Sequence, residues 1–348
     1  MIVDVAQFVI VFVIALTVTA VSTPLARRFA LRMGLVDLPN PRRINKVPMP
    51  TGGGMAIFAG FLAAAVVGDI PHFGVTVLSA GVILLLGVLD DRYELSAGVK
   101  FAGQVFAVLL YVLWGPRIEF MSNPFGEMLY VGRLSIPLTM LWVLTLVNIM
   151  NFIDGIDGLT TGISLIGAVA LTTLAVLLGR YDAAILAVIV VGTTLGFLPY
   201  NFNPARVYLG DGGAMLLGFL LAAISTEGAL KGAATIGISV PILILAVPVT
   251  DLLCAVVRRF QQGVPIYQAD RSHFHHKLLD MGFSQRQVVY VAYLITGFSA
   301  TMAILTAHMS RITWIVTLIL GLLFLYGSRR VGMIKPFSES HKGDTKDV

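Results

Sequence analysis

Long apolar stretches separated by short polar ones make up nearly all of the 348-residue sequence. Each apolar stretch approaches the length, roughly 17–25 residues, that a helix needs to cross the hydrocarbon core of a bilayer. The pattern predicts eleven spans, at 5–26, 52–68, 73–89, 99–114, 137–150, 159–178, 183–199, 212–226, 233–256, 288–306 and 312–328. The spans 137–150 and 212–226 look short and are expected to extend into neighbouring residues. We therefore expect an all-α polytopic integral membrane protein with a single membrane-embedded domain over 1–348.

Composition agrees with this pattern. Hydrophobic residues make up 57% of the chain and charged residues 12%, and the mean hydropathy is +0.88, whereas a soluble domain carries about 25% charged residues. The single cysteine, Cys254, excludes an intrachain disulfide. The first apolar stretch lacks a basic leader and carries Asp4, which favours a retained span over a cleaved signal.

Lysine and arginine collect in alternate loops, which sets the expected orientation. The positive-inside rule places the richer set of loops in the cytoplasm. We therefore expect the N-terminus outside, and both the 258–287 loop and the 329–348 tail in the cytoplasm. The basic residues of the opposite loops are few: Arg117, Arg133, Arg180, Lys231 and Arg311. The net charge of +5 is explained by topology and does not indicate nucleic-acid binding.

Unusual polar motifs lie at the cytoplasmic ends of the predicted spans. They read P-T-G-G-G (50–54), D-D-R-Y-E (90–94), N-I-M-N-F-I-D-G-I-D-G-L (148–159), N-P-A-R-V-Y-L-G-D-G-G (203–213) and D-R-S-H-F-H-H (270–276). The outer loops carry little comparable, although 115–136 could form a hairpin. The chemistry is therefore expected at the cytoplasmic face.

The motif at 148–159 places Asn148, Asn151, Asp154 and Asp157 at a constant step of three residues. In a helix this step moves successive side chains slowly round one side, so they could line a shared wall. Such polarity between two membrane-length segments favours a site for a polar ligand. The alternative is a hydrogen-bonded cluster that satisfies interrupted helix ends.

Three further carboxylates are candidates for metal chemistry. Asp90 and Asp91 are adjacent and would repel each other unless a cation or proton neutralised them. Asp211 lies between glycines at the start of a predicted helix, where a diphosphate could approach free backbone amides. Magnesium takes one or two carboxylates together with phosphates and waters. The alternative for each is a helix cap.

Basic and histidine side chains lie near the same face. The candidates for phosphate contacts are Lys46, Arg259, Arg271, His273, His275 and His276. Zinc is disfavoured because no second cysteine and no H-E-x-x-H motif occurs. The alternatives are positive-inside anchors, a solvated histidine helix and, for the glycines at 52–54, close helix packing.

In combination and order, D-D, N-x-x-N-F-x-D-G-x-D-G-L, G-D-x-G and H-x-H-H resemble the polyprenyl-phosphate N-acetylhexosamine-1-phosphate transferases of glycosyltransferase family 4. Phe274 interrupts the histidine run and, with the eleventh span, favours the WecA/TagO branch. Gly213 departs from the serine common in relatives. The resemblance implies transfer of N-acetylglucosamine 1-phosphate from UDP-N-acetylglucosamine to undecaprenyl phosphate, with release of UMP. This is the first membrane step of a cell-envelope polysaccharide or teichoic acid pathway.

The resemblance also implies residue roles. Asp211 and Asp91 would hold Mg²⁺, for which Mn²⁺ could substitute, and Asp90 would act as base or position the lipid phosphate. Asn151, Asp154 and Asp157 would orient the nucleotide, and Arg259 with the histidines would hold phosphates. The implied setting is the bacterial cytoplasmic membrane, with membrane lipid around the chain and a homodimer as the assembly that fits the family. A two-step route through an aspartyl phosphate stays open.

Two alternatives remain at the level of the sequence. The related transferase branch uses UDP-N-acetylmuramoyl-pentapeptide in peptidoglycan synthesis. An ion-coupled secondary transporter would also carry intramembrane carboxylates and broken helices, but near the midplane of paired repeats. Here, Asp251 aside, the polar groups collect at one face and no repeat is evident.

Overall fold

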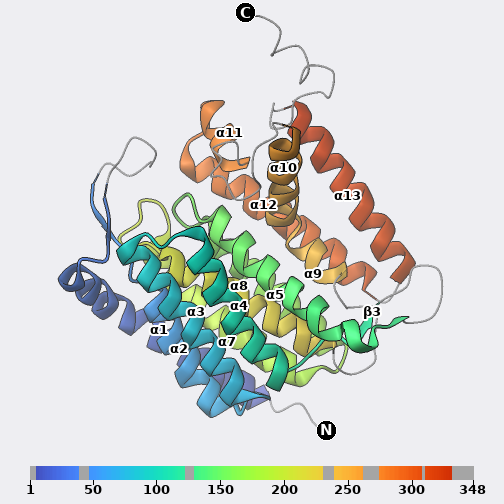
Figure 1. Ribbon diagram of the computed structural model, residues 1–348, viewed down its shortest axis with the longest axis horizontal. Helices are drawn as coiled ribbons and strands as arrows, with labels where there is room; N and C mark the ends of the chain where they lie inside the picture. Colours follow the sequence, from blue (N-terminus) through green and yellow to red (C-terminus); the bar gives the residue numbers. More distant parts are fainter. Residues whose placement is uncertain are drawn as a thin grey trace, which may run out of the picture.

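The computed structural model is almost entirely helical (Figure 1). It describes residues 5–38, 47–121, 129–229, 239–261, 274–307 and 310–330. Seven helical segments in this part of the chain are long and apolar enough to cross a membrane, and their outer faces carry exposed valine, leucine and phenylalanine side chains. An all-α polytopic membrane protein is therefore confirmed.

Most predicted spans coincide with single helices. The first eight helices are α1 (Val5–Met33), α2 (Gly53–Gly68), α3 (Phe73–Tyr93), α4 (Ala97–Trp114), α5 (Ser135–Ile153), α6 (Leu159–Leu177), α7 (Tyr181–Asn201) and α8 (Gly210–Ala229). The two spans that looked short, 137–150 and 212–226, are longer at both ends, as α5 and α8. The segment that follows them, 233–256, differs from the prediction by a break in the helix.

The span predicted at 233–256 is not one continuous helix over its described part. The described part of this segment forms α9 (Ser239–Ile244) and α10 (Ala246–Gln261), with a break at Leu245. Pro248 lies in the first turn of α10, where its missing N–H removes no helical hydrogen bond. In a continuous helix the same ring would clash with the carbonyl four residues earlier, so the chain starts a new helix instead.

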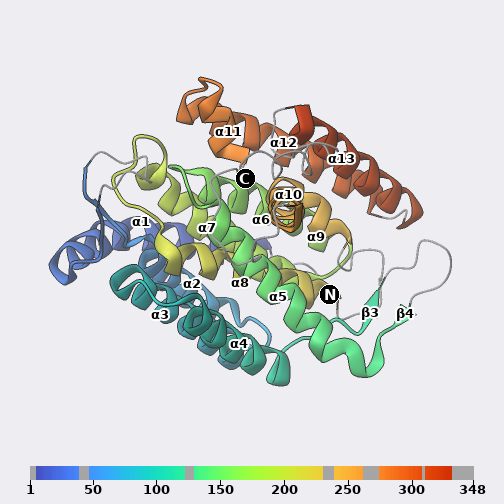
Figure 2. The same ribbon diagram turned by 45° about the horizontal axis from the view of Figure 1, so that its top comes forward.

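Helix α8 is the centre of the bundle. It contacts α2, α3, α5, α6 and α7 (Figure 2), and every apolar side chain from Ala214 to Ile224 is at most 2% exposed. Glycines allow this close packing. Gly87 of α3 lies against the backbone of Gly212, and a Cβ at Gly213 would lie 2.9 Å from the Cα of Gly54. The glycine at position 213, where relatives commonly have serine, therefore suits the close approach of Gly54 in α2.

Short strands and loops tie the helix ends together. Strands β1 (Val36–Asp37) and β2 (Met49–Pro50) pair antiparallel, and Thr51 forms a parallel bridge with Tyr208. At the far end of α4 the hairpin predicted within 115–136 is present as β3 (Phe120–Met121) and β4 (Leu129–Tyr130). The bridge between Thr51 and Tyr208 fixes the 203–209 loop beside the start of α2.

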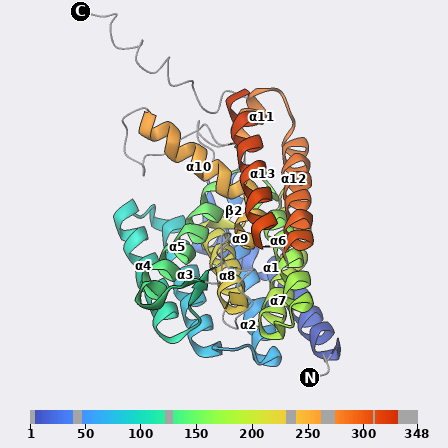
Figure 3. The ribbon, with the colours of Figure 1, turned by 90° about the vertical axis from the view of Figure 1, so that its right-hand side faces the viewer.

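The last helices pack on one side of the bundle (Figure 3). They are α11 (Phe274–Asp280), α12 (Gln285–Thr306) and α13 (Ser310–Arg330). Ser284 and Gln287 form a capping box at the start of α12, and Gly282 takes a φ of 91° after α11. Helix α12 packs on α6, which brings its N-terminus to the same end of the bundle as the polar motifs.

Candidate active site

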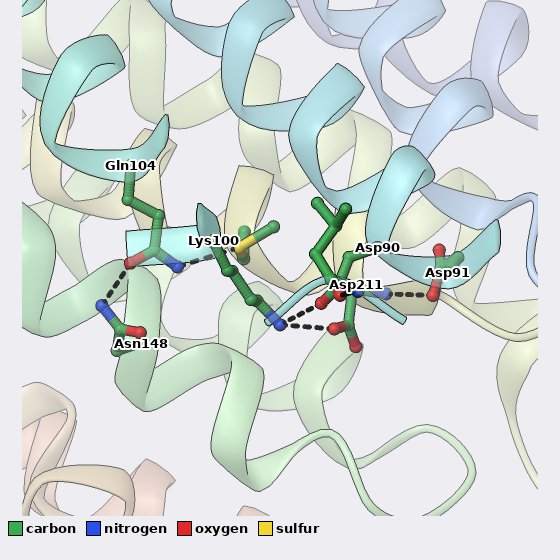
Figure 4. Close-up of polar contacts among 8 residues, drawn as sticks. Asp90, Asp91, Lys100, Gln104, Asn148 and Asp211 are labelled. Atoms are coloured by element: carbon green, nitrogen blue, oxygen red, sulfur yellow. Dashed lines mark hydrogen bonds and ion pairs between the residues drawn. The ribbon is translucent and has the colours of Figure 1, made fainter. Parts of the chain in front are cut away.

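A lysine links two of the predicted carboxylates (Figure 4). The Nζ atom of Lys100 lies 2.6 Å from Asp90 Oδ2 and 2.5 Å from Asp211 Oδ2. The other oxygen of Asp90 accepts a hydrogen bond from the backbone N–H of Leu95 at 2.8 Å. Helices α3, α4 and α8 therefore meet through one cation and two carboxylates.

Asp91 caps the start of α8. Its Oδ1 accepts a hydrogen bond from the backbone N–H of Asp211 at 3.0 Å, so one of the free amides expected at this helix end is already used. Gly210, at a φ of 74°, leaves room for the carboxylate, because a Cβ there would lie 2.5 Å from Asp91 Oδ2. The alternative role predicted for Asp90 and Asp91 is a cap to the next helix, whereas Asp91 caps α8, and this bond orders it beside Asp211.

Asn151 completes the cluster from α5. Its amide lies 2.8 Å from Lys100 Nζ and 3.3 Å from Asp211 Oδ1, and the orientation that satisfies both neighbours has its oxygen accepting from Lys100 and its nitrogen donating to Asp211. Four helices, α3, α4, α5 and α8, therefore each contribute at least one polar side chain to one cluster.

A cavity of about 420 Å³ opens beside this cluster. Its acidic lining consists of Asp37, Asp91, Asp154, Asp157 and Asp211. Other polar lining side chains are Thr51, Asn201, Tyr208, His276 and Gln285. Four of the carboxylates predicted from the sequence thus share one cavity, while Asp90 joins them through Lys100.

Asp157 is held by a second set of polar contacts, separate from the Lys100 cluster. Its Oδ2 accepts hydrogen bonds from Asn203 Nδ2 at 2.9 Å and from the backbone N–H of Ala205 at 3.0 Å. Asn203 Nδ2 also donates to Gln285 Oε1 at 2.9 Å, and Arg286 Nε donates to the carbonyl oxygen of Asn203 at 3.1 Å. The 203–209 loop thereby connects the turn after α5 to the N-terminus of α12.

Asp154 has an altered acidity. It lies just after the end of α5, in the turn before α6. Desolvation by the surrounding protein, with a smaller effect from the charges of Asp211 and Asp157, raises the pKa of its carboxyl to about 7. A carboxyl shifted in this way within a cavity is typical of a functional site.

The other predicted site residues fall in different places. Asn148 lies one turn deeper than Asn151 and donates to Gln104 Oε1 at 2.9 Å. Arg259 is buried in the last turn of α10 and is not one of the described cavity-lining residues. His275 belongs to α11, and His276 lines the cavity. Lys46, Arg271 and His273 lie outside the described residues.

The glycines at the start of α2 serve packing. The backbone N–H groups of Gly53 and Gly54 donate to the carbonyl oxygens of Tyr208 and Leu209, each at 3.0 Å. A Cβ at Gly53 would collide with Phe197. This arrangement favours the packing alternative over a phosphate contact.

The donor set fits a magnesium ion that is completed by substrate. Within the described ranges, no three His, Cys, Asp or Glu side chains are grouped as metal ligands. Magnesium commonly binds one or two carboxylates and takes its remaining ligands from phosphates and water. Asp91 and Asp211, ordered side by side on the cavity wall, provide such a pair.

Sequence reasoning missed Lys100 and Asn203. Lys100 counted only as a positive-inside charge, although it falls within the predicted span 99–114, where a lysine is itself a signal of function. Asn203 opens the polar motif at 203–213, but the sequence does not mark it as a site residue, because its two partners lie 46 and 82 residues away.

Comparison with known proteins supports the resemblance found in the sequence. The sequence profile described as "Glycosyl transferase family 4" matches residues 73–229. A Bacillus subtilis protein named as a probable undecaprenyl-phosphate N-acetylglucosaminyl 1-phosphate transferase is 36% identical, over 97% of this chain and 96% of its own length. A decaprenyl-phosphate N-acetylglucosaminephosphotransferase of Mycobacterium tuberculosis H37Rv is 36% identical, over 84% and 81%.

A more distant relative agrees with these two. The undecaprenyl-phosphate alpha-N-acetylglucosaminyl 1-phosphate transferase of Escherichia coli K12 is 29% identical, over 87% of this chain and 85% of its own length. Relatives similar over nearly the whole chain, together with the profile match across the helices that build the carboxylate cluster, show that this chain belongs to glycosyl transferase family 4.

Proposed function

We propose that this protein transfers N-acetylglucosamine 1-phosphate from UDP-N-acetylglucosamine to undecaprenyl phosphate, with Mg²⁺ as cofactor. The observation that carries the proposal is the meeting of Asp91, Asp154, Asp157 and Asp211 in one cavity, with Lys100 joining Asp211 to Asp90. The names of the relatives support the lipid acceptor and the transferred group.

The reaction exchanges one phosphorus–oxygen bond for another. An oxygen of the lipid phosphate bonds to the phosphorus that carries the sugar, and the bond from that phosphorus to the bridging oxygen breaks. UMP leaves with the electron pair, and undecaprenyl-diphosphate-N-acetylglucosamine is formed. Such transfers depend on charge neutralisation and in-line placement rather than on covalent help from the protein.

The acidic cluster would organise the phosphates. Asp211 and Asp91 would hold Mg²⁺, and the bound ion would neutralise charge on the diphosphate of the donor. Lys100 would place a positive charge beside the reacting phosphates. Asp90 contacts Lys100 but does not line the described cavity wall, which suits positioning of the lipid phosphate or the role of base.

The cavity beyond the cluster would hold the nucleotide. Asn151, Asp154 and Asp157 would orient it, and His276 would contact a phosphate from α11. Asp157 suits this role because Asn203 and Ala205 hold one of its oxygens, which fixes the direction of the other.

The proposal includes a membrane arrangement. Eleven crossings, an outer N-terminus and a cytoplasmic active site in the bacterial cytoplasmic membrane would let a water-soluble donor meet a membrane-bound acceptor. The product would enter a cell-envelope polysaccharide or teichoic acid pathway. A homodimer is the proposed assembly, to be tested by native mass spectrometry in lipid nanodiscs.

Release of UMP tests the proposed reaction. Purified protein is mixed with Mg²⁺, UDP-N-acetylglucosamine and undecaprenyl phosphate, and each component is omitted in turn. We expect UMP only when lipid and metal are both present, and none from Asp90→Asn, Asp91→Asn or Asp211→Asn. The matched control is Glu119→Gln, an exposed residue beyond the far end of α4, which should retain full activity.

Two results would change the proposal. Full activity of Asp211→Asn would remove the metal assignment, and turnover without lipid would remove the acceptor. One equivalent of UMP per protein before lipid is added would indicate an aspartyl-phosphate intermediate. A panel with the galactosamine epimer and the muramoyl-pentapeptide nucleotide tests the choice of donor.

A further inference from the structure

Three helices each carry a second polar or sulfur-containing residue one turn deeper than a residue of the cluster. In α4, Gln104 follows Lys100 by four positions; in α5, Asn148 precedes Asn151 by three; in α8, Met215 follows Asp211 by four. These spacings place both members of each pair on the same helix face. The second layer therefore lies directly beneath the first.

Gln104 joins the members of this second layer (Figure 4). Its side chain is 1% exposed. Its Oε1 accepts a hydrogen bond from Asn148 Nδ2 at 2.9 Å, and its Nε2 donates to Met215 Sδ at 3.1 Å. Asn148 Nδ2 also donates to the carbonyl oxygen of Leu144 at 2.8 Å, which fixes the amide on α5. One buried amide thus spans α4, α5 and α8.

A buried amide permits few arrangements of the helices around it. Removing an amide from water without hydrogen-bond partners is costly, so rotation of α4 against α5 or α8 would leave part of Gln104 unsatisfied. The same rotation would move Lys100, four residues away on the same face, relative to Asp211 and Asn151. The contacts of Lys100 therefore depend on the contacts of Gln104.

We propose that Gln104 is a positioning residue, whose amide sets the rotation of α4 against α5 and α8 and thereby holds Lys100 Nζ between Asp90 and Asp211. The inference rests on the proposed role of Lys100 in the reaction. It also gives Asn148 a place in the protein scaffold in place of the substrate contact predicted from the sequence.

The chain contains a matched control on the same pair of helices. Two turns further along α4, the hydroxyl of Tyr111 lies 2.9 Å from Thr226 Oγ1 of α8, and Tyr111 is 1% exposed. Tyr111→Phe removes a buried polar contact between α4 and α8 far from Lys100. A purely structural role for Gln104 predicts that the two positions behave alike.

The experiment compares Gln104→Leu with Tyr111→Phe. Three quantities are measured: kcat and KM for both substrates, the thermal unfolding midpoint, and the rate at which an amine-reactive reagent modifies Lys100, read by peptide mass spectrometry. For Gln104→Leu we expect kcat to fall about 10–100-fold, the loss typical of a misplacement near 1 Å, with KM nearly unchanged. Lys100 should be modified several-fold faster. Tyr111→Phe should lower the unfolding midpoint alone.

Two further variants keep the test decisive. Met215→Leu preserves an apolar side chain of similar size and removes only the acceptor for Gln104 Nε2, so it should give a smaller loss of kcat with faster Lys100 modification. The exchanged pair Gln104→Asn with Asn148→Gln rebuilds an amide bridge of the same total length and should recover most of the lost kcat.

The outcomes separate this proposal from the proposed function. Wild-type kcat and wild-type Lys100 modification in Gln104→Leu would overturn it, as would losses that match those of Tyr111→Phe. Full activity of Lys100→Met would instead overturn the role of Lys100 in the reaction, whereas faster modification of Lys100 in Gln104→Leu would still support the positioning contact.

Discussion

Lys100 places one positive charge between two carboxylates at the edge of an apolar bundle. Without it, Asp90 and Asp211 would repel each other across a short distance with limited screening by water. The same charge lies where a diphosphate would approach Asp211. Lys100 therefore has both a structural and a chemical reason to be present.

Lys100→Met tests whether the positive charge of Lys100 acts on the reacting phosphates. We expect kcat to fall by about 100-fold or more, since removing one preorganised electrostatic contact commonly costs that much. UMP release measures the effect. Arg28→Met, an exposed basic residue on α1, is the control and should match the wild type. Activity of Lys100→Met within a few-fold of wild type would contradict the prediction.

Asn203 acts on a different part of the cavity. Its amide holds both Asp157 and Gln285, so Asn203→Leu should free the Asp157 carboxylate and raise KM for the nucleotide donor about tenfold, with a smaller change in kcat. Gln285→Leu keeps the Asn203–Asp157 bond and should have a weaker effect. Equal KM values in Asn203→Leu and wild type would show that Asp157 needs no such support.

At the scale of elements, the approach of α3 to α8 decides whether the cluster can form. Gly87 contacts the backbone of Gly212 directly, whereas Gly74 of the same helix has open space around it. Asp90 and Asp91 follow Gly87 within about one turn, so the helix separation at Gly87 controls their distance from Asp211.

Gly87→Ala should therefore reduce both stability and activity. The added methyl group would overpack the contact at a cost of about 1–3 kcal/mol and push the carboxylates away from α8. Thermal unfolding in detergent and UMP release measure the two effects. Gly74→Ala should change neither, and a Gly87→Ala protein that unfolds at the wild-type temperature would refute the close contact.

At the scale of the whole molecule, the orientation in the membrane determines which substrates can reach the cavity. Cys254 is buried, so replacing it with serine gives a cysteine-free background for labelling. Asp280→Cys lies in α11, near the cavity end of the bundle, and Glu119→Cys lies beyond the opposite end of α4.

The proposed orientation predicts opposite labelling of these two cysteines. A membrane-impermeant thiol reagent should label Glu119→Cys in intact cells, or in spheroplasts where an outer barrier exists. It should label Asp280→Cys only after the membrane is opened. The reverse pattern would place the cavity outside and remove the route for a cytoplasmic nucleotide.

The local sequence was enough to predict the class of fold and the polar motifs that form the cavity. Apolar runs of membrane length specify helices because every backbone polar group must be satisfied within the segment. Carboxylates and glycines at helix ends stand out against this apolar background. For this reason the sequence alone predicts Asp91, Asp154, Asp157 and Asp211 as site residues.

Tertiary structure decided which polar residues act together. Asn148 and Asn151 look equivalent at a step of three residues, but only Asn151 reaches Asp211, while Asn148 pairs with Gln104. Lys100 and Asp211 are 111 residues apart, so their pairing follows from the packing of α3, α4 and α8. The motifs and their chemistry were local properties of the sequence, whereas the distances between them were set by how the helices pack.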